Sequence, residues 1–459
     1  MADLVVRRVL HHLSTLPDQP IGQYATRATL EAMLREPAPE EGSSLESVLA
    51  RFDEQIVPHA CHVSHPRFLA FVPGAPTLAS VLGDWLCAGH NFFAGVWLES
   101  SACAQVELVV LDWFRDMLGM PASTGGILTS GGSEANLTAL VVARDRLPFA
   151  DRGRAVLYAS RERHSSIDRA ANVIGLSPGQ VRLVGIDAGH RLDVADLRRR
   201  IADDRAAGLF PWLLVGNAGT TNTGAVDPLG DLADLCQNEG IWLHIDGAYG
   251  WAAVLDPEGR RALAGVERAD SITLDPHKWL AQPFEVGCLL VRDGGLLPRT
   301  FAIRPDYLQD TEPEIDEVNF ADHGIALTRR FRALKVWLSM QVLGLAWFRR
   351  HVTRCMALAH YAETALILAG FEILSPASLS VVCFRAGREG ADEAAVDRAN
   401  LDLAEAVRRS QEAFIASTRI GGRVALRLCF VNWRTTVGDV DRVVGLMRRL
   451  AGKQEFSHR

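Results

Sequence analysis

The chain has 459 residues, of which 48% are hydrophobic and 22% are charged, so it can bury a large core and is not mainly disordered. Acidic residues outnumber basic ones by 55 to 48, and the net charge of −7 argues against nucleic acid or an anionic membrane as the main partner. The N-terminus carries no secretory signal pattern, no segment contains ~18 uninterrupted apolar residues, and the eight scattered cysteines form no disulfide framework. We therefore expect a cytoplasmic protein that binds neither nucleic acid nor a membrane.

Along the chain, residues 1–60 are typical of helices with polar breaks, and residues 100–120 have apolar side chains at helical spacing. Short apolar runs then alternate with helical segments, and most of these runs are nearly continuous, as in strands covered on both faces. This alternation predicts an α/β fold with a mostly parallel central sheet and helices on both faces. The expected strands lie at residues 125–132, 155–160, 181–187, 212–219, 241–248, 271–275 and 287–293, and helices between them at residues 133–144, 194–204 and 228–238.

The C-terminal part of the chain changes character after a long amphipathic segment at residues 324–346. Strands expected at residues 371–376, 380–386 and 423–430 alternate with helices at residues 391–416 and 436–450. This pattern predicts a small C-terminal α+β domain. We expect three parts, which are a helical segment (1–60), a large domain (61–350) and a small domain (351–459).

The segment Thr129–Glu134, Thr-Ser-Gly-Gly-Ser-Glu, joins an expected strand to an expected helix. Glycines let the backbone approach a ligand closely, and the first turn of a helix offers free N–H groups and the positive end of its dipole. Such a turn suits a phosphate group. Taken alone, the motif is better explained as a plain turn with Ser133 as the helix cap.

Three further side chains follow expected strands, at the edge where ligands bind in open α/β sheets. Asp246 needs a cationic partner such as a protonated ring nitrogen, although a metal ion or a helix N-terminus would also satisfy it. Lys278, which follows His277, is a candidate for a desolvated amine that forms Schiff bases with carbonyls. His164 follows the strand at 155–160, where a structural role is the common alternative.

The number of lysines strengthens the choice of Lys278. The chain contains three lysines, and we expect Lys335, in a helical segment, and Lys453, in the polar tail, to be ordinary surface residues. A phosphate site, a carboxylate for a ring nitrogen and a Schiff-base lysine together describe a site for pyridoxal 5′-phosphate (PLP), the common cofactor that uses all three.

With these residues in place, the chain resembles the group II PLP-dependent amino acid decarboxylases, the family of aromatic-L-amino-acid, glutamate and related decarboxylases. The resemblance implies a fold-type I PLP enzyme that releases CO2 and an amine from an amino acid. It also implies a homodimer with active sites at the subunit interface and an N-terminal segment that packs on the partner subunit. The matching motifs are HPRFLAF (65–71), TSGGSEANLTAL (129–140), HSS (164–166), NAGTTNTGAVDP (217–228), LHIDGAYG (243–250), DPHKWL (275–280) and RRFRALKVW (329–337).

The resemblance also assigns roles to individual residues. Lys278 would carry PLP as a Schiff base, and Asp246 would pair with the ring nitrogen. His164 would stack on the cofactor ring, Ala248 would support the opposite face, and Thr221 would lie near the ring substituents. The phosphate would be bound by Gly132, Ser133 and His277.

One position departs from the family pattern. The decarboxylases usually have a loop tyrosine that protonates the carbanion left by CO2, and counting back from Arg329 places Phe320 there. In one hypothesis His323 or a water molecule supplies the proton and the product is an amine. In the other the carbanion reacts with oxygen to give an aldehyde, ammonia and CO2, as in relatives that have phenylalanine at this place. A shifted loop alignment would leave Phe320 as a packing residue.

The substrate is less well defined by the sequence. The resemblance places Phe71, Val72 and Pro73 in the side-chain pocket with Phe93 from the partner subunit, although all four are compatible with an ordinary core. Their apolar character favours an aromatic or bulky apolar amino acid over glutamate. An aminotransferase or β-lyase shares the fold but matches the motifs less well, and a non-catalytic PLP-binding protein would not need both the lysine and the aspartate.

Overall fold

The computed structural model describes residues 1–303, 313–314, 316–387 and 392–456. Cα proximity divides the chain into a first compact unit of residues 1–75, 358–376 and 381–459, and a second of residues 76–357 with 377–380. The N-terminal segment thus shares a unit with the C-terminal residues, whereas we expected boundaries at residues 60 and 350. The three expected parts were defined by their sequence character and expected roles and not by Cα proximity, so that division stays a prediction.

Seven strands of the second unit form one mixed sheet in the order β1-β7-β6-β5-β4-β2-β3. All pairs among β2 to β6 are parallel, whereas β7 is antiparallel to both of its neighbours. Nearly every residue of β2, β4, β5 and β6 is buried, as expected of apolar strands covered on both faces. The predicted mostly parallel α/β sheet is therefore confirmed. Its strands are β1 (Gly125–Thr129), β2 (Ala155–Ser160), β3 (Val181–Val184), β4 (Phe210–Asn217), β5 (Trp242–Asp246), β6 (Ser271–Leu274) and β7 (Gly287–Val291).

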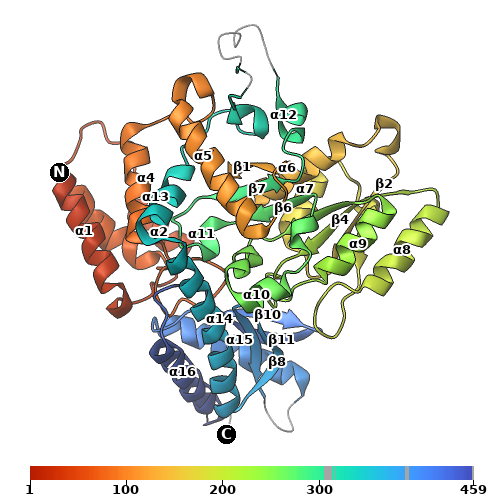
Figure 1. Ribbon diagram of the computed structural model, residues 1–459. Coiled ribbons are helices and arrows are strands. Elements are labelled where there is room, and N and C mark those ends of the chain that lie inside the picture. The colour runs from red at the N-terminus through yellow and green to blue at the C-terminus, as the bar shows by residue number, and fades with distance from the viewer. Residues whose placement is uncertain (304–312, 315, 388–391, 457–459) are drawn as a thin grey trace. The chain divides into compact units, whose positions relative to one another are not determined.

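Helices cover both faces of this sheet (Figure 1). α6 (Gly132–Asp145) and α7 (Ser165–Val173) connect strands that progress toward β3, whereas α8 (Val194–Ala206) and α9 (Leu229–Glu239) connect strands that return toward β5. Because crossovers between parallel strands are right-handed, the two pairs of helices lie on opposite faces. The carboxyl ends of β1, β2, β4, β5 and β6 consequently meet at one edge of the sheet, where the order of the strands reverses.

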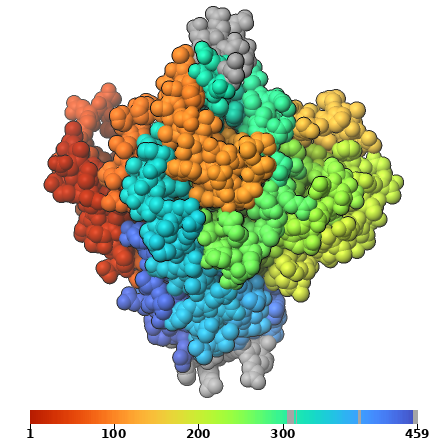
Figure 2. All heavy atoms as spheres, in the orientation of Figure 1, coloured from red at the N-terminus to blue at the C-terminus, as the bar shows by residue number. Residues whose placement is uncertain are grey.

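The second unit has further helices, among them α5 (Trp97–Leu118), whose atoms belong to the orange region at the front of Figure 2. The helix expected at residues 324–346 is shorter at its start, because α13 runs from Ala333 to Leu343 and α14 (Leu345–Leu368) follows. Residues before α13 are irregular, and the carbonyl of Arg329 accepts a hydrogen bond from the N–H of Ala94 instead of a helical one. The other helices are α4 (Leu78–His90), α10 (Pro257–Ala262), α11 (Pro276–Trp279) and α12 (Leu296–Phe301).

The C-terminal region has its own sheet, in the order β10-β11-β9-β8, with antiparallel pairing of β11 to β10 and to β9. The predicted C-terminal α+β domain is thus confirmed, although β10 was not predicted, because burial along this edge strand is weak. Its elements are β8 (Phe371–Ser378), β9 (Val381–Ala386), β10 (Ala416–Ile420), β11 (Arg423–Cys429), α15 (Glu393–Arg409) and α16 (Val437–Phe456).

The N-terminal helices of the first unit leave their apolar side chains exposed or only partly buried. α1 (Ala2–Thr15), α2 (Arg27–Leu34) and α3 (Leu45–Arg51) contain no buried residue. Leu10 and Val48, for example, are 43% and 49% exposed. None of the helices that the structure describes is long and apolar enough to span a bilayer.

Candidate active site

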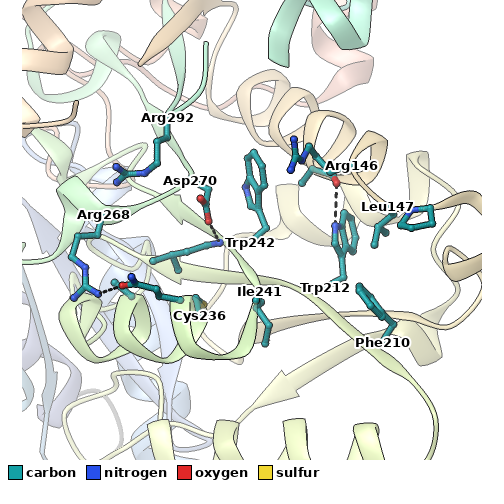
Figure 3. Close-up of a pocket in the computed structure, with 16 residues that line it drawn as sticks. Arg146, Leu147, Phe210, Trp212, Cys236, Ile241, Trp242, Arg268, Asp270 and Arg292 are labelled. Carbon is teal, nitrogen blue, oxygen red and sulfur yellow. Dashed lines mark hydrogen bonds between the residues drawn. The ribbon is translucent and has the colours of Figure 1, made fainter. Parts of the chain in front are cut away.

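A cavity of about 360 Å³ lies at the carboxyl edge of the seven-stranded sheet. A larger cavity, of about 600 Å³, lies at the opposite edge around Trp212 and Trp242 (Figure 3). Ligands of open α/β sheets bind at the carboxyl ends of the strands, and the smaller volume is within the range of small-molecule sites, so the smaller cavity is the candidate active site. It is lined by Ser130, Gly131, Gly132, Ser133, Glu134, Asn136, His164, Ser166, Asn217, Gly219, Thr221, Asp246, Ala248, Tyr249, Asp275, His277 and Lys278.

The turn between β1 and α6 forms one wall of this cavity. α6 begins at Gly132 with Gly131 as its N-cap, so the expected cap at Ser133 is wrong. A Cβ atom on Gly132 would lie 3.0 Å from Asp275 Oδ2 and 3.1 Å from Ala248 Cβ, which shows how closely the turn packs. The first N–H groups of a helix have no partner within the helix, so this wall suits an anion such as phosphate.

Lys278 and Asp275 form an ion pair on the turn after β6. Lys278 Nζ lies 3.1 Å from Asp275 Oδ2, and His277 Nε2 lies 3.8 Å from the same oxygen. His277 is held in place by a 2.7 Å hydrogen bond from Nδ1 to the carbonyl of Val286, and burial lowers its pKa. Asp275 Oδ1 is buried and has no hydrogen-bond partner within the described residues.

Asp246 is the last residue of β5, and its side chain lines the cavity. One carboxylate oxygen accepts a 3.1 Å hydrogen bond from the N–H of Ala248, and the other accepts one of 3.1 Å from Asn136 Nδ2. Each carboxylate oxygen can accept two hydrogen bonds, so Asp246 keeps capacity for a cationic donor in the cavity.

His164 and Thr221 come from turns after two other strands. His164 caps α7, and its Nδ1 atom lies 2.8 Å from Ser166 Oγ. Thr221 follows β4 and is exposed, next to the buried pair Thr220 and Thr223, whose hydroxyl groups are 3.0 Å apart. The structure thus brings together all eight residues that were expected to bind the cofactor.

Phe320 and His323 are not brought into this cavity. Phe320 is 1% exposed and packs under the guanidinium group of Arg329, which lies 5.1 Å from the ring centroid. His323 contacts the Phe320 ring, and burial lowers its pKa to about 4. In the described conformation neither residue is among those that line the cavity.

The four residues expected to contact the substrate also lie outside the lining of the cavity within the described chain. Phe71 is 60% exposed, and Val72 is buried. Phe93 packs so closely on Gly95 that a Cβ atom there would lie 2.5 Å from the ring. The roles of these residues and of Pro73 stay predictions.

Lys335 is not the surface residue that we expected. Its side chain is 2% exposed, and Nζ donates hydrogen bonds to Asp84 Oδ2 at 3.0 Å and to the carbonyls of Pro283 and Glu285. The helical pattern showed that this side chain would lie on one face of α13, but not that Asp84 would face it. Burial lowers the pKa of Lys335, although the pairing with Asp84 opposes this effect.

Several residues of the site were missed at the level of sequence. Asp275 precedes Lys278 by three positions, and that spacing was a usable signal. Asn136 is a polar residue on the otherwise buried face of α6, and Ser166 belongs to the HSS motif. Asn217 and Tyr249 lie in the motifs at 217–228 and 243–250, but no role was assigned to them, because their place in the lining depends on segments far apart in the chain.

Known proteins match nearly the whole chain. Residues 28–387 match the pyridoxal-dependent decarboxylase conserved domain. An aromatic-L-amino-acid decarboxylase of Bacillus atrophaeus is 40% identical over 98% of this chain and 94% of its own length. A phenylacetaldehyde synthase of Arabidopsis thaliana is 31% identical over 92% of this chain and 89% of its own length. The crystal structure of Oryza sativa TDC with PLP and tryptamine has a TM-score of 0.93 at 30% identity, covering 99% of this chain and 97% of that chain.

Proposed function

The chain belongs to the pyridoxal-dependent decarboxylase family and is a PLP-dependent amino acid decarboxylase, and on this basis we propose that it converts an aromatic L-amino acid into CO2 and the corresponding amine. The observation that carries the proposal is the arrangement of Lys278, Asp246 and His164 around one cavity at the carboxyl edge of the sheet. The similarity to an aromatic-L-amino-acid decarboxylase supports the substrate class. The expected cytoplasmic location is part of the same proposal.

The residues that line the cavity fit PLP. Lys278 offers an amine for the cofactor aldehyde, and Asp246 offers a carboxylate for the ring nitrogen. Gly132 and Ser133 in the first turn of α6, with His277, would hold the phosphate, and a Cβ atom at Gly132 would narrow this wall. The ring would lie between the His164 and Ala248 side chains, with Thr221 near its substituents.

Bound there, PLP would supply an electron sink for the pair of electrons that remains at Cα when CO2 leaves. Asp246 would hold a proton at the ring nitrogen, because its carboxylate keeps free lone pairs beside the bonds from Ala248 and Asn136. Asp275 would serve as the counter-ion of Lys278 whenever that lysine is a free ammonium, at the 3.1 Å separation of the pair. His164 and Ala248 would keep water from the two faces of the ring.

The oxidative alternative, with an aldehyde as the product, is not favoured. It depended on phenylalanine in place of a tyrosine near the reacting carbon, and Phe320 is packed under Arg329 outside the cavity lining. The decarboxylase of Bacillus atrophaeus, at 40% identity, is also more similar to this chain than the phenylacetaldehyde synthase, at 31%.

We further propose that the enzyme is a homodimer, with residues 1–60 on the partner subunit and active sites at the interface. Exposed apolar side chains support this. On α4, Leu78, Leu82 and Leu86 are spaced four residues apart on one face and are 44%, 40% and 47% exposed. The N-terminal helices expose apolar side chains as well. Exposed apolar side chains that lie together on one helix face are typical of a subunit interface.

Product analysis tests the proposed function. The purified protein with added PLP is incubated with tryptophan, tyrosine, phenylalanine, leucine and glutamate, in air and without oxygen. Amine and CO2 in equal amounts from an aromatic substrate, in both atmospheres, are the expected result. Aldehyde and hydrogen peroxide that depend on oxygen would instead establish the oxidative reaction, and turnover of glutamate alone would overturn the substrate class.

A further inference from the structure

A chain of buried hydrogen bonds runs through the sheet behind the candidate active site. It begins at Trp242, which lines the larger cavity at the opposite edge (Figure 3). Its members come from β5, β6, α6 and α7, so it connects the two edges of the sheet. The contacts are Trp242 Nε1 to Ser271 Oγ (2.9 Å), Ser271 Oγ to His244 Nδ1 (2.9 Å), His244 Nε2 to Asn136 Oδ1 (2.9 Å), Asn136 Nδ2 to Asp246 Oδ2 (3.1 Å) and to Ser166 Oγ (2.8 Å), and Ser166 Oγ to His164 Nδ1 (2.8 Å).

The directions of the bonds in this chain follow from the donors and acceptors that its members offer. A tryptophan N–H can only donate, and Asp246 Oδ2 accepts from the amide group of Asn136. Asn136 must therefore turn its NH2 group toward Asp246, which leaves its Oδ1 atom to accept from His244 Nε2–H. Burial lowers the pKa of His244 to about 4, which favours the neutral ring, and its Nδ1 atom lies 2.9 Å from Ser271 Oγ, whose hydroxyl can donate to it. The Ser271 oxygen in turn accepts from Trp242.

The branch to His164 is determined in the same way. The NH2 group of Asn136 also donates to Ser166 Oγ, so the hydroxyl hydrogen of Ser166 is available for His164 Nδ1. The backbone N–H of Ser166 donates to the same nitrogen at 3.2 Å. His164 Nδ1 therefore acts as an acceptor and carries no proton, which places the N–H of the ring on Nε2.

We propose that Asn136 and His244 are positioning residues, which direct an N–H donor at Asp246 and keep His164 in the Nε2–H form. The inference rests on the proposed function, because it matters for catalysis only if PLP lies between Asp246 and His164. A purely structural network would hold the protein together but would not affect how Asp246 and His164 contact the cofactor. The other titratable groups that share the cavity with Asp246 are Glu134, His164, Tyr249, Asp275, His277 and Lys278.

The protonation pattern is tested first on the protein without cofactor. Nitrogen NMR of a sample labelled at histidine reports which ring nitrogen carries the proton. We expect His244 to stay neutral with the proton on Nε2 from about pH 6 to about pH 8, since its pKa is far below this range. A proton on Nδ1 of His244 in place of Nε2 would reverse the donor and acceptor roles of this ring and overturn the proposal. This result does not depend on whether the enzyme decarboxylates any amino acid.

The second test replaces Asn136 with aspartate, which keeps the shape of the side chain but removes the donor to Asp246. Two facing carboxylates cannot both be ionised at low cost, so PLP affinity should fall at least about tenfold at pH 8. At about pH 6 a shared proton restores a donor between the two carboxyl groups, and the loss relative to the wild type should become smaller. Asn136→Ala has no donor at either pH, so its loss of PLP affinity should not depend on pH.

Asn400→Asp is the matched control, because Asn400 is also fully buried and hydrogen-bonded but lies in α15. It should lower the thermal midpoint without a pH-dependent change in PLP affinity. If Asn136→Asp behaves like this control, the network is structural and the proposal is wrong. If the wild type itself binds no PLP, the proposed function fails instead, and the NMR result still decides the protonation pattern.

A variant at the far end of the hydrogen-bond chain, at Trp242, covers the case in which Asn136→Asp does not fold. Trp242→Phe removes the donor to Ser271 but leaves every residue of the active-site cavity in place. Trp212 lines the same larger cavity and donates its N–H to the carbonyl of Ala143, outside the chain of bonds, so Trp212→Phe is its control (Figure 3). We expect the pH midpoint of the cofactor absorption band to move in Trp242→Phe and to stay in place in Trp212→Phe. Equal behaviour of the two variants would contradict the proposal.

Discussion

Lys278 Nζ lies 3.1 Å from Asp275 Oδ2, on the turn that follows β6. The carboxylate side chain is 3% exposed and that of the lysine is 22% exposed, and both residues line the cavity. His277 Nε2 lies 3.8 Å from the same oxygen, which is beyond hydrogen-bond distance. Asp275 is therefore the carboxylate that positions the free amine of Lys278 in the cavity.

Replacing Lys278 with alanine tests this attachment. Without the amine, the absorption band of the lysine-bound cofactor should disappear, and kcat should fall roughly a thousandfold or more. Lys453→Ala is the control, because it removes an amine from α16 and should preserve both the band and kcat. Absorption spectra and CO2 release measure the two quantities. An unchanged band in the Lys278 variant would exclude this residue as the site of attachment.

Replacing Asp246 with asparagine should separate charge from shape. The amide retains an acceptor for the N–H of Ala248, but it cannot stabilise a protonated ring nitrogen, so kcat should fall roughly a hundredfold or more. The thermal midpoint should change little, because the side chain keeps its size. Steady-state kinetics and thermal unfolding are measured on the same preparation. A variant with nearly wild-type kcat would show that the carboxylate charge is not needed.

The sheet and the turns around its ligand edge could be predicted from sequence because both are local signals. Continuous apolar runs marked β2, β4 and β5, and the residues at their ends could only meet at the shared carboxyl edge. Lys278 and Asp246 were found for this reason. Their partners within a few residues, such as Asp275, were within reach of the same reasoning.

The remaining features depend on partners far away in the chain. Lys335 is buried because Asp84, 251 residues earlier, faces it, and no helical period contains that information. Asn136 links Asp246 to His244 through contacts more than 100 residues apart in sequence. The place of Phe320 was not predictable either, since it depends on how the Arg329 guanidinium group packs.

The apolar stripe on α4, formed by Leu78, Leu82 and Leu86, predicts how a charge would affect the proposed subunit interface. In Leu82→Glu a carboxylate would be buried between subunits, so the dimer should dissociate and activity should fall with it. Leu368→Glu is the control, because Leu368 is 82% exposed at the end of α14 and outside the stripe. Light scattering coupled to size-exclusion chromatography measures the mass. A Leu82→Glu variant that remains an active dimer would place the interface elsewhere.

His323 predicts part of the acid sensitivity of the protein. Burial lowers its pKa from 6.5 to about 4, so between these values the unfolded chain binds more protons than the folded one. Its stabilising contribution is therefore complete above pH 6.5 and is lost as the pH falls toward 4, with a total of about 3 kcal/mol for a shift of this size. Asp227, whose pKa burial raises to about 6, changes stability in the opposite direction over an overlapping range.

Replacing His323 with phenylalanine should remove this contribution. The free energy of unfolding, measured with urea at about pH 7 and about pH 4.5, should differ between the two conditions by about 2 kcal/mol less than in the wild type. At pH 7 the variant should be less stable by about 1 kcal/mol, because the hydrogen bond to the backbone at Gly126 is lost. His11→Phe, at an exposed position of α1, is the control and should keep the wild-type difference.

Acid sensitivity will persist in part in His323→Phe, because His65, His244 and His351 are also buried with pKa values lowered to about 4. An unchanged difference in His323→Phe would mean that this ring is hydrated in solution and not packed against Phe320.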